Sequence, residues 1–315
     1  MRADPQRMQI GIDLGGTKIE AVGLEAGSMV GPRRRLATPR DYDGTLDAIA
    51  RLVAELERET GRSGTVGVGI PGVVARATGL VKNANSTWLI GRPLQADLER
   101  RLARPVRVAN DANCFTLSEA MDGAARGVET VFGVILGTGV GGGIAVRQHI
   151  LEGINQVAGE WGHNPLPWMT DEERAAAPEC YCGKTGCVET WLSGPAFERD
   201  YAALAGARRP GADIVRAAAG GEPHAVQALR RYEDRLARGL AAVVNLLDPD
   251  AIVLGGGMSN LPDLAPATAA LLPRHVFSDT VATPVLPNAH GDSSGVRGAA
   301  WLWPACHAGG PDGVS

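Results

Sequence analysis

Apolar runs that end in glycine recur along the chain, and their pattern predicts strands joined by tight turns. Residues 8–24 form an apolar run, a Gly-Gly turn and a second apolar run, which predicts a β-hairpin rather than a strand followed by a helix. Residues 131–146 repeat this arrangement around a second glycine turn. Two hairpins of similar sequence pattern predict a duplicated domain.

Other segments pair a strand with a helix. Residues 64–72 predict a strand that ends at Ile-Pro-Gly, and residues 106–121 predict a strand that continues into a helix. Apolar residues at helical spacing predict a long amphipathic helix over about 224–247, which stops before Pro249. A buried strand and a glycine loop follow at 251–260, so we expect α/β layers.

Length and charge limit the functions to consider. A chain of 315 residues predicts two domains, each with its own core. The net charge of −4, with both signs interspersed, argues against nucleic acid and anionic membranes as partners, and the basic run 33–35 is expected to be a solvated face. No apolar segment has the length of a membrane span or the form of a secretory signal, so we expect a cytoplasmic protein without structural disulfides.

Three of the five cysteines lie within eight residues, in the segment CYCGKTGC. Cys180, Cys182 and Cys187 have the spacing C-x-C-x4-C, and Gly183 and Gly186 allow the backbone to wrap around something small. Zinc prefers four tetrahedral ligands drawn from thiolate and imidazole.

The fourth ligand is expected to be His163, the nearest histidine, in the segment GEWGHNPLPW. Four protein ligands would make this a structural zinc with no open position for chemistry. The alternative is that the cysteines pack as small hydrophobic residues, and this is the interpretation we give to Cys114 and Cys306.

The first hairpin turn carries groups that bind phosphate. Gly15 and Gly16 expose backbone amides, Thr17 offers a hydroxyl and Lys18 an ammonium, with Asp13 just before them as a candidate magnesium ligand. The spacing is not that of a Walker loop, and a simple turn without a ligand remains the alternative.

The second turn contains Gly137, Thr138 and Gly139. With Gly142 and Glu160 it also fits a dinucleotide-binding pattern, but the residues that follow are strand-like, whereas that motif must open a helix. A third cluster, Gly255, Gly256 and Gly257, would let a nucleotide base or ribose lie against bare backbone; a plain strand-to-helix turn is the alternative.

Asn110 and Asp111 lie where a predicted strand meets a predicted helix. Helix capping would explain both residues. The functional alternative is a carboxylate at the carboxyl end of a strand, where open α/β sheets bind ligands.

These motifs, in this order, resemble the ROK family of sugar kinases and repressors. The resemblance runs from about Met8 to Trp303, and GEWGH with CYCGKTGC carries most of its specificity. Segments 81–88, 159–169 and 291–304 most resemble the manno(fructo)kinase branch of the family.

The resemblance implies a duplicated actin-like, ribonuclease-H-like ATPase fold, in which two α/β domains close an interdomain cleft over ATP and a sugar, with a zinc loop in one of them. The smaller domain would comprise residues 8–117 and 293–303, and the larger one residues 118–292.

It also implies roles for particular residues. Asp111 would be the catalytic base, and Asn110, Glu160, His163 and Glu189 would bind sugar hydroxyls. His163 would then hold zinc with one ring nitrogen and face the sugar with the other, which fixes its tautomer. Asn83 and Asn85, with Thr87, would lie near the sugar, although a polar surface loop explains them equally well.

The expected reaction is transfer of the γ-phosphoryl group of Mg-ATP to a hexose, with O6 of fructose or mannose favoured. A glucokinase or N-acetylhexosamine kinase of the same family is the main alternative, and a non-catalytic sugar sensor is a second. The repressors of the family carry a DNA-binding helix-turn-helix ahead of the first hairpin; only seven residues precede Met8 here, so we expect a kinase rather than a repressor. The resemblance to this family also implies a homodimer.

Overall fold

The computed structural model describes residues 8–84 and 86–303, and these divide into two compact units. The first contains residues 8–122 and 292–303, and the second contains residues 123–291. The division falls at 122/123 rather than 117/118 because a helix, α3 (Asp111–Met121), continues to its end within the first unit. Asn85 and Cys306 lie outside the described residues.

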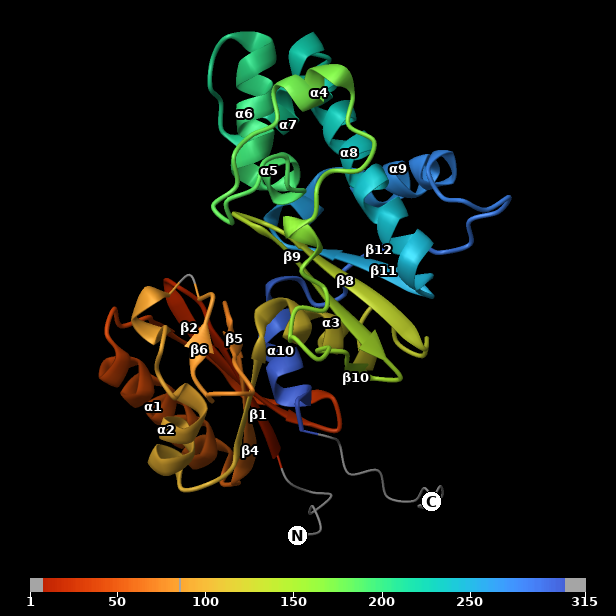
Figure 1. The fold of residues 1–315 in the computed structure, drawn as a ribbon. Helices are drawn as coiled ribbons and strands as arrows, with labels where there is room; N and C mark the ends of the chain where they lie inside the picture. The colour runs from red at the N-terminus through yellow and green to blue at the C-terminus, as the bar shows by residue number, and fades with distance from the viewer. Residues whose placement is uncertain (1–7, 85, 304–315) are drawn as a thin grey trace. The chain divides into compact units, whose positions relative to one another are not determined.

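The first unit is built on a five-stranded sheet with the order β3-β2-β1-β4-β7 (Figure 1). Its strands are β1 (Met8–Leu14), β2 (Lys18–Glu25), β3 (Ser28–Ala37), β4 (Gly64–Ile70) and β7 (Val106–Asn110). The first three are antiparallel neighbours, and β4 and β7 continue parallel to β1. The hairpin predicted over residues 8–24 is therefore present.

Helices cover both faces of this sheet. The helices α1 (Tyr42–Thr60) and α2 (Leu94–Leu102) pack on one face, and α3 and α10 (Ser294–Trp301) pack on the other (Figure 1). Successive side chains of β1 point to opposite faces of the sheet. Ile10 and Ile12 are fully buried in the core that contains the apolar residues of α1. Gly11 faces α10, where a Cβ would lie 2.0 Å from a backbone oxygen of that helix. Short elements complete the unit: β5 (Val73–Val74), β6 (Val81–Lys82) and η1 (Thr87–Leu89).

The second unit repeats the same sheet, with the order β10-β9-β8-β11-β12. Its strands are β8 (Thr130–Leu136), β9 (Val140–Val146), β10 (His149–Ile150), β11 (Ala251–Gly255) and β12 (Val285–Pro287). Again three antiparallel strands are followed by two parallel ones. This repetition confirms the duplicated α/β fold.

The helices of the second unit pack around α8 (Pro223–Leu247), whose buried face includes Leu236, Leu240 and Ala241. The helical elements are η2 (Trp161–His163), α4 (Asp171–Ala175), α5 (Glu189–Leu192), α6 (Gly194–Ala205), α7 (Gly211–Ala219), α8 (Pro223–Leu247), η3 (Gly257–Asn260), α9 (Leu264–Leu271) and η4 (Leu272–Arg274). A last turn, η5 (Gly291–Ser293), leads back to α10. Among the described residues, no helix combines the length and the apolar character that a membrane span requires.

Candidate functional site

The turn between β1 and β2 presents the first candidate phosphate site. The amide of Gly15 donates to the carbonyl of Lys18 at 3.0 Å, which closes the turn. Gly16 and Thr17 are exposed at its tip. The hydroxyl of Thr38, the residue after β3, donates to the carbonyl of Gly15 at 2.7 Å and supports the turn from its side.

Lys18 belongs to a charge cluster around a buried carboxylate, Glu20, which is 1% exposed. The Lys18 ammonium lies 3.3 Å from Glu20, and both Arg33 and Arg35 also pair with this carboxylate. Burial raises the pKa of Glu20, but hydrogen bonds from Arg33 and Arg35 outweigh it, so the net pKa is lowered. The expectation that residues 33–35 form a solvated face therefore misses the ion pairs that Arg33 and Arg35 make with this buried carboxylate, although Arg35 itself is exposed.

Asp13, at the end of β1, lies in the field of other carboxylates. Its pKa is raised to about 7, first by burial and then by the negative charges of Asp111 and Glu20, while Lys18 and Arg33 act in the opposite direction. A divalent cation relieves such repulsion, and carboxylate oxygen is the ligand type that Mg²⁺ prefers. The donor chemistry around Asp13 therefore fits a magnesium ion.

Asn110 and Asp111 lie at the junction of β7 and α3. Asn110 is the N-cap of α3: its side-chain oxygen accepts from the amides of Ala112 at 2.9 Å and Asn113 at 3.4 Å. Its side-chain nitrogen donates to the carbonyl of Gly72 at 3.4 Å. Capping thus holds the junction and fixes Asp111 as the first residue of the helix.

Asn83 is an exposed residue of the same unit, with the backbone in the left-handed region (φ 56). Its place in a sugar site stays a prediction. The prediction for Asn85 falls outside the described residues.

The second glycine turn, Gly137 to Gly139, is tied to two later segments of its own unit. The amide of Gly137 donates to the carbonyl of Gly139 at 2.9 Å, and the amide of Gly194 donates to the carbonyl of Gly137 at 2.8 Å. Oε2 of Glu189 accepts a hydrogen bond from the amide of Val140 at 2.9 Å. Thr138 is exposed at the tip of this turn.

The third glycine cluster lies beside the second. Gly255 ends β11, and Gly256 has a positive φ of 82 before η3 begins at Gly257. A Cβ on Gly256 would lie 2.4 Å from the carbonyl oxygen of Leu136, the residue before the second turn. The structure therefore brings two of the predicted nucleotide-binding segments together within this unit.

The segment GEWGH is anchored by its tryptophan. Trp161 is 5% exposed, its indole nitrogen donates to the carbonyl of Gly141 at 3.0 Å, and its ring meets Phe132 edge to face. This anchor fixes η2 on β9. It places Glu160 at the surface and leaves His163 half-buried.

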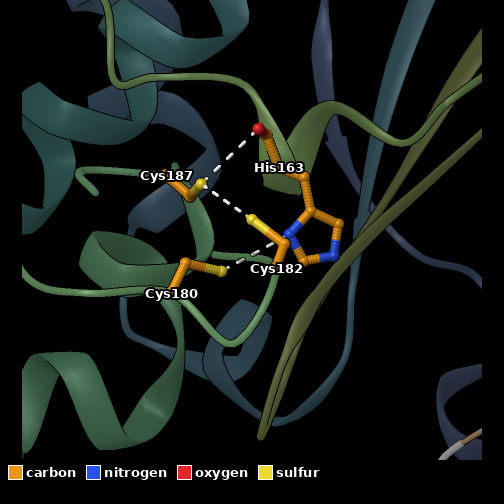
Figure 2. Close-up of side chains that lie close together, drawn as sticks. All are labelled: His163, Cys180, Cys182 and Cys187. Carbon is orange, nitrogen blue, oxygen red and sulfur yellow. Dashed lines mark hydrogen bonds between the residues drawn. The ribbon is translucent and has the colours of Figure 1, made fainter. Parts of the chain in front are cut away.

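The four predicted zinc ligands converge (Figure 2). The Sγ of Cys180 lies 3.5 Å from Nδ1 of His163, and the Sγ atoms of Cys182 and Cys187 are 3.6 Å apart. All four ligand atoms lie within 4.8 Å of one another. Tetrahedral zinc, with bonds of about 2.3 Å to sulfur and about 2.0 Å to nitrogen, requires separations of this size between its ligands. Three thiols and one imidazole in this geometry fit a structural zinc ion.

The loop backbone supports this cluster. Gly183 and Gly186 both have positive φ, as their predicted role requires, and the amide of Cys180 donates to the carbonyl of Lys184 at 2.7 Å. Cys187 forms an antiparallel bridge with Pro165, which joins the loop to the segment after His163. Cys114, by contrast, is fully buried in the first unit, and burial raises the pKa of its thiol, so it is an inert packing residue as expected.

The other ring nitrogen of His163 has a partner that sequence reasoning missed. Its Nε2 lies 3.0 Å from the hydroxyl of Tyr181, and the two rings meet edge to face. Tyr181 is 81% exposed, although it stands between two cysteine ligands in the sequence. An exposed aromatic residue inside a ligand motif is the signal that could have identified it.

Comparisons with known proteins agree with this picture. The sequence model of the ROK family matches residues 9–306. The N-acetyl-D-glucosamine kinase of Photobacterium profundum is 40% identical over 299 residues, which is 94% of this chain and 99% of that protein.

Two solved structures share the fold along almost the whole chain. The ROK hexokinase from Thermus thermophilus has a TM-score of 0.83 and 30% identity, and covers 93% of this chain and 97% of its own. The ROK family glucokinase from Streptomyces griseus, solved with glucose and AMPPNP, has a TM-score of 0.75 and 32% identity, and covers 94% of this chain and 98% of its own.

Proposed function

The chain belongs to the ROK family of sugar kinases, and we propose that this member transfers the γ-phosphoryl group of ATP to N-acetyl-D-glucosamine. The observation that carries the choice of sugar is the similarity, over nearly the entire chain, to a relative of that name. The sequence alone favours fructose or mannose, with a glucokinase or N-acetylhexosamine kinase of the same family as the main alternative. The comparison supports that alternative better.

Asp111 is the proposed general base. It accepts the proton of the acceptor hydroxyl, which we take to be O6, while that oxygen forms its bond to the γ-phosphorus and the bond from phosphorus to the leaving oxygen of ADP breaks. The rigid N-cap made by Asn110 favours this role, because phosphoryl transfer depends chiefly on positioning.

The nucleotide is proposed to bind at the glycine turns. The exposed amides around Gly16 and Thr138 are donors for phosphate oxygens, and the segment Gly255 to Gly257 is proposed to face the base or ribose. A magnesium ion, when bound, would neutralise charge on the phosphates, and Asp13 is the residue proposed to hold it.

The sugar is proposed to be held by Asn110, Glu160, His163 and Glu189, with Asn83 nearby. Zinc on Nδ1 of His163 leaves the hydrogen on Nε2, so the ring can donate one well-aimed hydrogen bond. The metal would thus act as a scaffold that orients a sugar-binding side chain.

A parallel assay tests the proposal. ADP release from Mg-ATP would be measured with purified, zinc-loaded protein against N-acetyl-D-glucosamine, N-acetylmannosamine, glucose, mannose and fructose. The proposal expects the highest kcat/KM with N-acetyl-D-glucosamine. Preference for fructose or mannose would overturn the choice of sugar but not the kinase activity. Absence of ADP release with all five sugars would favour a non-catalytic sensor.

A further inference from the structure

Glu189 contacts the second glycine turn directly, although it belongs to the segment that follows the cysteine loop. Its Oε2 accepts from the amide of Val140 at 2.9 Å. A Cβ at position 139 would lie 2.6 Å from the same oxygen, so the glycine at this position is what allows the carboxylate to reach the turn. The contact is therefore built into both segments.

The opposite end of the turn is held by the same stretch of chain. The amide of Gly194, five residues after Glu189, donates to the carbonyl of Gly137 at 2.8 Å. The turn is thus fixed at both ends, by the first residue of the short helix α5 and by the first residue of α6.

The helix α5 is in turn fixed to the cysteine loop and to the core. The amide of Val188 donates to the carbonyl of Asn164, next to His163, at 2.8 Å. Leu192 is fully buried, and its carbonyl accepts from the hydroxyl of Tyr232 at 2.8 Å. Glu189 therefore has little freedom to move without the loop that carries the zinc ligands.

We propose that Glu189 is a positioning residue that couples the cysteine loop to the glycine turn at Gly137, so that the loop controls nucleotide affinity as well as sugar affinity. The nucleotide half of this inference rests on the proposed function. A carboxylate has two oxygens, and the bond from Val140 uses Oε2. The same side chain can therefore accept a sugar hydroxyl with Oε1, which makes it a link between the two substrates.

The test combines two measurements on the full chain. The first is residue-resolved amide hydrogen exchange at Val140, which reports the hydrogen bond itself. The second is the Kd of AMPPNP, a non-hydrolysable ATP analogue, measured by calorimetry with Mg²⁺ and without sugar. The variants are Glu189→Ala, Glu189→Gln and, as the matched control, Glu160→Ala.

Glu189→Ala is expected to speed exchange at Val140 and to weaken AMPPNP binding, each on the order of tenfold, because the turn loses a charged acceptor. Glu189→Gln keeps an acceptor oxygen and is expected to rescue most of both effects. Glu160→Ala removes another proposed sugar ligand and is expected to leave both readouts unchanged. A change in Glu189→Ala alone could then not be explained by a role of Glu189 confined to sugar binding.

Unchanged exchange at Val140 in Glu189→Ala would overturn the coupling. Faster exchange with an unchanged Kd for AMPPNP would overturn its nucleotide half. If the wild-type chain failed to bind AMPPNP at all, the proposed function would fail instead, while the exchange measurement would still decide whether Glu189 holds the turn.

Treatment with a metal chelator provides a second test of the proposal. Chelation is expected to speed exchange at Val140 together with that of the cysteine loop, while the core strand β11 stays protected. A loop that exchanges freely around a still-protected Val140 would show that the turn does not depend on the loop, and would contradict the proposal.

Discussion

Nε2 of His163 and the hydroxyl of Tyr181 lie 3.0 Å apart. When zinc holds Nδ1, the single hydrogen of the neutral imidazole is on Nε2, so the phenol oxygen must accept it. This is the same nitrogen that is proposed to bind the sugar. Tyr181 is therefore placed to compete with the sugar for one donor.

Replacement of Tyr181 by Phe should consequently lower the KM for the sugar, by roughly two- to tenfold, the usual effect of one neutral hydrogen bond. Steady-state kinetics with the preferred sugar of the panel check this. The KM for ATP in the same variant is the internal control, and it should not change. A KM for the sugar that stays the same or rises would show that the hydroxyl does not compete.

Asp111→Asn should retain sugar binding and lose turnover on the order of 10²- to 10⁴-fold, because the amide cannot accept the proton of the acceptor hydroxyl. The kcat and the sugar Kd from calorimetry separate these effects. Asp43→Asn is a matched control, since Asp43 is an exposed acid in the first turn of α1 and its replacement should leave kcat unchanged. Wild-type turnover in Asp111→Asn would remove Asp111 from the mechanism.

The cysteine cluster should hold one zinc ion per chain, which metal analysis by mass spectrometry can count. Cys182→Ser should reduce this occupancy strongly, because zinc loses a thiolate ligand. Cys114→Ala, at a buried cysteine in the other unit, should keep the full equivalent. Well-folded wild-type protein with far less than one equivalent would contradict the assignment.

The features predicted correctly from the sequence are those set by local pattern. The hairpin turn at Gly15 and the convergence of His163 with the three loop cysteines follow from residue types at short spacing, and the repeated sheet follows from two similar hairpins. The junction at Asn110 was predicted in two ways, as a helix cap and as part of a site. The cap is present, and it is also what fixes Asp111.

The missed features depend on register and tertiary contact. Glu20 lies opposite Arg35 across β2 and β3, and only this register turns a basic run into partners of a buried carboxylate. The approach of Tyr181 to His163 likewise needs the folded loop. The acceptor sugar could not be predicted for a related reason. A pocket distinguishes hexoses by a few hydrogen bonds, and the geometry of these bonds does not follow from the residue types alone.

A buried ion cluster supports the segment between His163 and the cysteine loop, the two parts of the predicted zinc site. Glu173 is 6% exposed and accepts hydrogen bonds from Arg235 and Arg238, each at 2.8 Å. Arg238 also donates to the carbonyls of Pro167 at 3.1 Å and Trp168 at 3.0 Å, in the stretch that leads from His163 to Cys180. Burial alone would raise the pKa of Glu173, but the two arginines outweigh it and lower the pKa from 4.5 to about 2.

Glu173→Gln should therefore destabilise the protein by about 3 kcal/mol at pH 7, since two buried arginines lose the carboxylate that they share and keep only Asp200 and Asp234 as partners. Because the pKa of this carboxyl is lower in the folded chain than in the unfolded one, its contribution is complete above about pH 4.5 and is lost as the pH falls toward 2. The difference in unfolding free energy between wild type and variant, measured with urea at pH 7, 5 and 3.5, should thus be constant between the first two values and smaller at the third. Asp171→Asn, at a carboxylate 95% exposed in the same helix, should change stability by less than about 1 kcal/mol at every pH. An equally small effect of Glu173→Gln at pH 7 would show that the cluster does not stabilise this segment.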